Sequence, residues 1–286
     1  METIWYYLFE VMVAVYVVLD GFDLGAGAQH QFVARSDSVR RTVLQSIGPV
    51  WDGYEVWLRG GGGAMVLAFP RLYASGFSGF YLPLMFVLWL LILRAISIEF
   101  RSHLKSPIWR PVWDVVFSVS SLLLAVLLGA ALGNVVRGVP LGDDGSFFTP
   151  LWTSFRTGST ELGILDWYTL CVGVTSLLAL TYHGAMWLIL KTEGEIRDRA
   201  RKVAGLTWPA LLAFVALVTI FTFGIQPHVP GRMNGNPLSY GLPLVALVGT
   251  VFSRISMSGG RELSAFLGSA VFLAFMLLSV VFGLYP

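Results

Sequence analysis

Five carboxylates stand near the ends of apolar stretches, where a charge that can be switched could handle protons. They are Asp20, Asp23, Asp52, Glu55 and Glu99. Asp20 and Asp23 are three residues apart, as are Asp52 and Glu55, so each pair projects from one face of a helix. A carboxylate near hydrocarbon is costly and usually marks a buried partner, an ion site or a proton route. These residues therefore indicate proton handling or the docking of a charged partner.

Simpler roles stay open for several of these groups. Asp20 could end a helix in headgroup water, and Asp52 could cap a helix, because a helix N-terminus favours negative charge. Arg59 follows Glu55 by four residues, so we expect the two to form an ion pair. Glu99 is expected in an inner-face ion-pair cluster with Arg94 and Arg101 around it.

The remaining titratable residues indicate no catalytic or metal site. Cys171 is the only cysteine, which excludes an intrachain disulfide and a cysteine-based metal site. The four histidines include no pair at metal-ligand spacing. His183 lies inside an apolar stretch and could ligate haem, but we expect it to hydrogen-bond a neighbouring helix.

Membrane helices must position these side chains. The 286-residue chain is 56% hydrophobic and 13% charged, whereas soluble domains carry about 25% charged residues. Apolar segments of roughly 20 residues can span a bilayer. We predict an all-α, polytopic integral membrane protein with about eight transmembrane helices in a single membrane domain, residues 1–286; a division into two four-helix units stays open. The segments are 4–24, 50–69, 77–99, 113–134, 165–190, 207–226, 240–255 and 263–284.

The distribution of basic residues predicts the orientation. Most of the 19 lysines and arginines fall in the loops after the first, third, fifth and seventh segments. Loops rich in Lys and Arg face the cytoplasm, so both termini are predicted outside and all five carboxylates at the inner face. No signal peptide is evident, and we expect segment 4–24 to remain as a helix. The net charge of +2 gives no sign of nucleic-acid binding.

Several long stretches, read in order, resemble subunit II of the cytochrome bd-type quinol oxidases. They include the sequence DGFDLGAG and the sequence IGPVWDG followed by EVWL. The final third of the chain is similar mainly in hydropathy. The matching stretches are 20–27, 47–53, 55–58, 68–74, 77–83, 93–101, 129–138 and 183–194.

The resemblance implies a place in an enzyme that passes electrons from membrane quinol to dioxygen and makes water. In this family subunit I carries two haems b, one haem d and the quinol site. Subunit II usually binds no haem and completes the heterodimer in the bacterial cytoplasmic (inner) membrane. A structural quinone or lipid and a small accessory subunit are further partners to expect.

The resemblance also assigns roles to individual residues. The aspartate of the family's Trp–Asp–Gly motif falls on Asp52, which implies proton uptake from the cytoplasm. The aspartate of Gly–Phe–Asp falls on Asp23, which we expect to relay protons, with Glu55 and Glu99 as supporting charges. The sequence departs from the family at Tyr54, where asparagine is usual, and at Arg59, where a small or apolar residue is usual. Family members also generally continue with a further helix beyond the position of the last residue.

Two other functions fit the same residues. A proton-coupled secondary transporter also places acidic residues at helix ends and breaks helices with glycine, as at 60–63. A purely structural scaffold would use the carboxylates only to hold the helices together.

Overall fold

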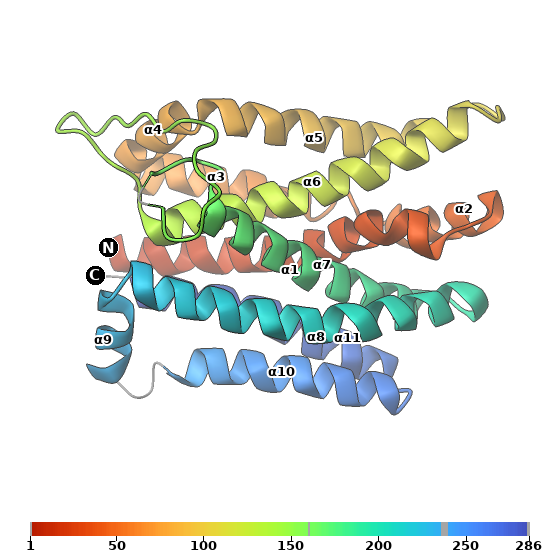
Figure 1. Ribbon diagram of the computed structural model, residues 1–286. Coiled ribbons are helices and arrows are strands. Elements are labelled where there is room, and N and C mark those ends of the chain that lie inside the picture. The colour runs from red at the N-terminus through yellow and green to blue at the C-terminus, as the bar shows by residue number, and fades with distance from the viewer. Residues whose placement is uncertain (1, 160, 236–239, 285–286) are drawn as a thin grey trace.

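The computed structural model describes residues 2–159, 161–235 and 240–284, which form a bundle of roughly parallel and antiparallel helices (Figure 1). Across these ranges the only β-structure is an isolated bridge between Trp152 and Leu165, so the all-α prediction is confirmed. The helices are α1 (Glu2–Val33), α2 (Asp37–Ile47), α3 (Glu55–Ala68), α4 (Pro70–Gly79), α5 (Tyr81–Phe100), α6 (Trp109–Arg137), α7 (Trp167–Lys191), α8 (Gly194–Ile225), α9 (His228–Gly235), α10 (Gly241–Ser258) and α11 (Glu262–Leu284).

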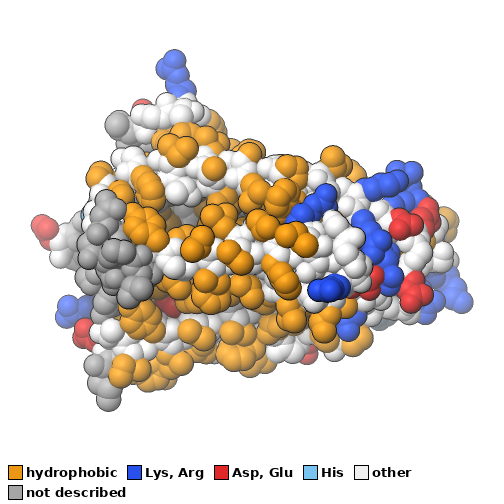
Figure 2. Space-filling model, turned by 90° about the horizontal axis from the view of Figure 1, so that it is seen from below, with side chains coloured by type: hydrophobic (Ala, Val, Ile, Leu, Met, Phe, Trp, Pro, Cys, Tyr) orange, Lys and Arg blue, Asp and Glu red, His pale blue; other side chains and the backbone are white. Residues whose placement is uncertain are grey.

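Seven of the described helices are long and apolar enough to cross a membrane: α1, α5, α6, α7, α8, α10 and α11. At a rise of about 1.5 Å per residue, about 20 residues cross the roughly 30 Å hydrocarbon layer. Lysine and arginine gather at one end of the bundle, and hydrophobic side chains cover the surface between the ends (Figure 2). The chain is therefore a multi-pass membrane protein. We call the end rich in lysine and arginine the basic end.

The segment predicted over 50–69 is not a single spanning helix. Helix α3 begins only at Glu55 and has 14 residues, and Phe69 separates it from α4. Pro70 occupies the first turn of α4, where its missing N–H is tolerated and its fixed φ favours a new helix start. Among the described residues, seven helices, against about eight predicted, thus have the length and apolarity of a span.

Helix α1 continues to Val33, nine residues past its predicted end at position 24. Asp20 and Asp23 therefore lie within the helix and not at its end, contrary to the prediction. Small residues allow the extension to pack in the centre of the bundle. A Cβ added at Gly25 would lie 1.8 Å from the carbonyl oxygen of Leu180 in α7, and one at Gly27 would lie 2.2 Å from Ser121 Oγ in α6.

The bundle has a buried centre and a more open periphery. Helices α1 and α7 are the most buried spans, and α1 packs against α3, α6, α7 and α11. Helix α8 also begins earlier than predicted, at Gly194 in place of position 207. In contrast, α5 and α8 bury little of their surface within the chain, so lipid or another polypeptide must cover them.

Candidate functional site

The buried carboxylates Asp20 and Asp23 of α1 converge on Arg94 of α5. Arg94 Nη1 lies 2.7 Å from Asp20 Oδ1, and Arg94 Nη2 lies 3.8 Å from Asp23 Oδ2. All three side chains are buried, with 0–1% of each exposed. Sequence reasoning had expected Arg94 in a cluster with Glu99. Its true partners are 74 and 71 residues away in sequence, a pairing that helix periodicity could not reveal.

Two phenols complete the buried cluster. Tyr16 OH donates to Asp20 Oδ2 at 2.7 Å, and Tyr54 OH donates to Asp23 Oδ2 at 2.6 Å. Tyr54, one of the two departures from the resemblance given above, is buried, and its hydroxyl is a hydrogen-bond donor to the site. Tyr16 escaped the sequence analysis, although its spacing of four residues from Asp20 places both on one face of α1.

A row of ion pairs leads from this cluster to the surface. Glu55 Oε1 lies 3.7 Å from Arg94 Nη2, and Glu55 Oε2 lies 3.4 Å from Arg59 Nη2, which confirms the expected pair of Glu55 with Arg59. The same Arg59 nitrogen lies 3.8 Å from Asp52 Oδ1. Exposure rises along the row, from 0% for Asp23 to 23% for Glu55 and 78% for Asp52. Buried and exposed carboxylates are thus joined by alternating arginines.

Several buried atoms of the cluster keep unused hydrogen-bonding capacity. Asp23 Oδ1, Arg94 Nε and Arg94 Nη2 have no hydrogen-bond partner among the residues that the structure describes. Buried polar groups of this kind normally bind ordered water. Asp23 Oδ1 is therefore an oxygen of the cluster that can still accept a proton.

Glu99 lies apart from this row. Its side chain is exposed near the end of α5, and it makes no ion pair within 4.0 Å with any described residue. The expected cluster of Glu99 with Arg101 does not form, because Arg101 turns toward α6. Arg101 Nε lies 2.5 Å from Asp114 Oδ1, and Arg101 Nη2 lies 2.8 Å from Asp37 Oδ1.

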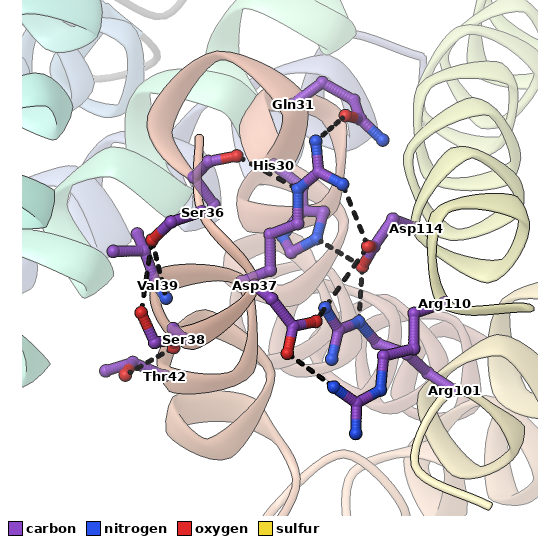
Figure 3. A network of polar contacts seen from close by, with 12 residues as sticks. His30, Gln31, Ser36, Asp37, Ser38, Val39, Thr42, Arg101, Arg110 and Asp114 are labelled. Carbon is purple, nitrogen blue, oxygen red and sulfur yellow. Dashed lines mark hydrogen bonds and ion pairs between the residues drawn. The ribbon is translucent and has the colours of Figure 1, made fainter. Parts of the chain in front are cut away.

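Asp114 is the centre of a second polar network at the basic end (Figure 3). Its buried carboxylate also contacts His30 Nε2 at 3.1 Å and Arg40 Nη1 at 3.1 Å. Burial opposes the charge of Arg101, but the hydrogen bonds and charges of Asp114 and Asp37 outweigh it and raise the pKa of Arg101. The network ties α1, α2, α5 and α6 together.

His183 forms the predicted hydrogen bonds between helices. Its Nδ1 lies 2.7 Å from Ser269 Oγ in α11, and its Nε2 lies 3.0 Å from the carbonyl oxygen of Val18 in α1. Both ring nitrogens are therefore engaged within the chain, and the histidine joins three helices at the buried centre.

The sequence and the fold were compared with known proteins. Residues 1–286 match the family model described as "Cytochrome bd terminal oxidase subunit II". The chain is 32% identical to "Probable cytochrome oxidase subunit 2" of Haemophilus influenzae and 28% identical to "Cytochrome bd-I ubiquinol oxidase subunit 2" of Escherichia coli, in each case over 99% of this chain and 80% of the relative. The solved "structure of bd oxidase from Geobacillus thermodenitrificans" matches with a TM-score of 0.78 at 18% identity, over 100% of this chain and 84% of that chain, which is a likeness of fold.

Proposed function

Since this chain belongs to the cytochrome bd terminal oxidase subunit II family, we propose that it is the non-haem subunit of a quinol oxidase and takes up protons for oxygen reduction. The chain is one subunit of an oxidoreductase complex. A haem-bearing subunit with haems b and d would oxidise quinol and reduce dioxygen to water. This subunit would stabilise that partner in the bacterial cytoplasmic membrane, with the basic end facing the cytoplasm and both termini outside.

The row of carboxylates from Asp52 to Asp23 carries the proposal for proton uptake. Asp52 is exposed and would accept protons from bulk water, Glu55 is half-buried and would pass them on, and Asp23 has a free oxygen at the buried end. Arginine does not release its proton at physiological pH. Arg59 and Arg94 would therefore position the carboxylates and balance their charge, while ordered water bridges the gaps between them.

Asp20 and Glu99 have smaller parts in this proposal. Asp20 is held by Arg94 at 2.7 Å and by the hydroxyl of Tyr16, so it serves as a fixed counter-charge. Glu99 enters only as a surface charge at the basic end that attracts protons to that face.

Replacing single carboxylates tests the proposal. In oxidase reconstituted in liposomes, Asp52→Asn and Glu55→Gln should slow quinol oxidation and proton uptake together by about 100-fold, the lower end of general acid–base effects. The haem absorbance should stay unchanged. Asp198→Asn is the matched control, because Asp198 is exposed near the basic end and outside the row. Unchanged rates of quinol oxidation and proton uptake, with an intact haem spectrum, would leave only the scaffold function. Proton-coupled transport by this chain alone in liposomes would support the rival function of a secondary transporter.

We further place the haem-bearing subunit against the surface formed by α3 and α5. A Cβ added at Gly62 or Gly63 would meet no atom of the described chain within 4 Å, so another helix can approach closely there. Arg59, on the same helix, is 67% exposed, and lipid would be a costly neighbour for it. Helix α5 adds exposed aromatic side chains at Phe86 and Trp89.

Cysteine cross-linking tests this placement. In a Cys171→Ser background, Gly63→Cys should cross-link to the haem-bearing subunit, whereas Ile220→Cys on the exposed face of α8 should not. Cross-linking from position 220 alone would move the interface to α8. A small accessory subunit and a structural quinone stay predictions from the family.

A further inference from the structure

An open cleft with a volume of about 430 Å³ lies between α1, α6, α7 and α8, away from the carboxylate row. Its volume falls in the range of about 300–1,000 Å³ that is usual for small-molecule sites. Leu206, which is 76% exposed, and Phe32, which is 70% exposed, stand at its mouth. The apolar lining includes Phe32, Leu122, Leu177, Leu178, Val203 and Leu206.

Three cations line the same cleft on the side of the basic end: Arg35, Arg199 and Lys202. Arg199 is engaged within the chain, because its Nη1 donates to the carbonyl oxygen of Val33 at 3.1 Å and its Nη2 pairs with Glu195. Arg35 and Lys202 are exposed and form no ion pair with any residue in the described ranges. Two positive charges at the cleft therefore lack a counter-charge from the part of the chain that the structure describes.

Gln29 supplies a polar site in the wall of the cleft. Its side chain is 1% exposed, and its Nε2 donates to the carbonyl oxygens of Gly25 at 3.1 Å and Thr181 at 3.3 Å. These bonds fix the amide, whose Oε1 is buried and accepts no hydrogen bond from the described residues. A buried acceptor without a donor is costly, so a hydroxyl or a water held by a ligand would stabilise it.

The spacing of these groups matches a lipid. Gln29 lies four residues before the end of α1 at Val33, which is on the order of 6 Å along the helix, and Arg35 follows two residues beyond that end. One headgroup layer of a bilayer is about 5–8 Å thick, from the difference between total and hydrocarbon thickness. If the cations lie at the phosphate level, Gln29 lies near the glycerol level, and the apolar lining lies at the level of the acyl chains.

We propose that this cleft binds one anionic phospholipid from the leaflet that meets the basic end. Its phosphate lies between Arg35 and Lys202, its glycerol region faces Gln29, and one acyl chain fills the apolar cleft between α6, α7 and α8. Basic pockets between membrane helices bind anionic headgroups in this way. A free phosphate would leave the apolar lining empty, and a neutral quinone would leave the cations without a counter-charge.

Lipid retention by the purified, delipidated oxidase tests the proposal. The complex is titrated with phosphatidylglycerol or phosphatidylcholine, and bound lipid is counted by native mass spectrometry. We expect one tightly held phosphatidylglycerol. Arg35→Gln with Lys202→Gln should weaken its binding about 30-fold, from ~1 kcal/mol for each basic residue near the surface and 1.4 kcal/mol per tenfold. The double control Arg41→Gln with Lys105→Gln removes the same charge from the same end, outside the cleft, and should leave binding unchanged.

A second pair of variants probes the apolar part of the cleft without changing charge. Leu206→Trp should obstruct the mouth and lower retention, whereas Ile220→Trp, at a similarly exposed position of α8 outside the cleft, should not. If the cleft variant and the double control lose the same amount of bound phosphatidylglycerol, the attraction is spread over the basic end and is not due to a site. That result would overturn the proposal. Phosphatidylcholine held as tightly as phosphatidylglycerol, or complete displacement by inorganic phosphate, would do the same. The count of bound lipid is independent of oxidase activity, so it also separates this proposal from that of proton uptake.

Discussion

Arg94 is the residue whose removal should destabilise the subunit most through electrostatics. Arg94→Met would leave Asp20 and Asp23 buried without the cation that lies 2.7 Å and 3.8 Å from them. At an effective dielectric constant of about 20, attractions at those distances are roughly 6 and 4 kcal/mol. Much of this is offset by the cost of burying the charges, and removing one partner of a buried pair typically costs about 3–5 kcal/mol.

Thermal unfolding of the purified complex, followed by circular dichroism, measures this effect. For a chain of this size a loss of about 3–5 kcal/mol corresponds to a fall in Tm of roughly 6–20 °C. Arg201→Met is the matched control, since Arg201 carries the same charge, is 39% exposed and pairs with Glu262 at 3.5 Å. That pair should contribute only about 0–1 kcal/mol.

A compensating change sharpens the test. Asp20→Asn combined with Arg94→Gln removes both charges of the closest pair, so we expect it to recover part of the stability lost in Arg94→Gln alone. If Arg94→Met melts within about 2 °C of the parent, or if the double variant is no more stable than Arg94→Gln, the carboxylates do not depend on Arg94. The reasoning about the buried cluster would then be wrong.

Three further variants should give graded effects in the same unfolding assay. Gly184→Ala places a Cβ 2.4 Å from the backbone of α1 and should lower the stability by about 1–3 kcal/mol or more, whereas Gly205→Ala, with open space around it, should cost nothing. His183→Phe removes the contacts to α1 and α11 and should cost more than Ser269→Ala, for which about 0.5–1.5 kcal/mol is expected. Tyr54→Phe removes the donor to a buried carboxylate and should cost about 1.5–3 kcal/mol; an unchanged Tm would mean that the hydroxyl is not needed there.

The sequence was sufficient for the class of fold, because the class depends on composition and local spacing. Apolar runs located the long helices, and the i, i+4 rule identified the pair of Glu55 with Arg59. His183 was recognised as a polar group in an apolar helix that needs partners on neighbouring helices. The family was recognised from stretches that the comparison with known proteins then confirmed.

The errors concern contacts between residues far apart in the chain. Hydropathy ended the first helix near position 24, where the apolar run gives way to glycines, Gln29 and His30. In the folded chain these glycines pack against α6 and α7, and Gln29 Nε2 donates to the carbonyl oxygen of Gly25, so the helix continues into the centre of the bundle. The same limit explains why Arg101 was assigned to Glu99 and not to Asp114, and why Tyr16 was overlooked.

Helix α1 directs three different groups of side chains toward three different neighbours. Asp20 and Asp23 face Arg94 of α5 and Tyr54 before α3, the glycines that follow face α6 and α7, and Gln29 lines the cleft beside α8. Because each residue turns a helix by about 100°, the step of six positions from Asp23 to Gln29 is enough to change the neighbour completely. Substitutions along one turn and a half of α1 should therefore separate proton uptake, helix packing and lipid binding, and a single variant that disturbs all three would indicate collapse of α1 itself.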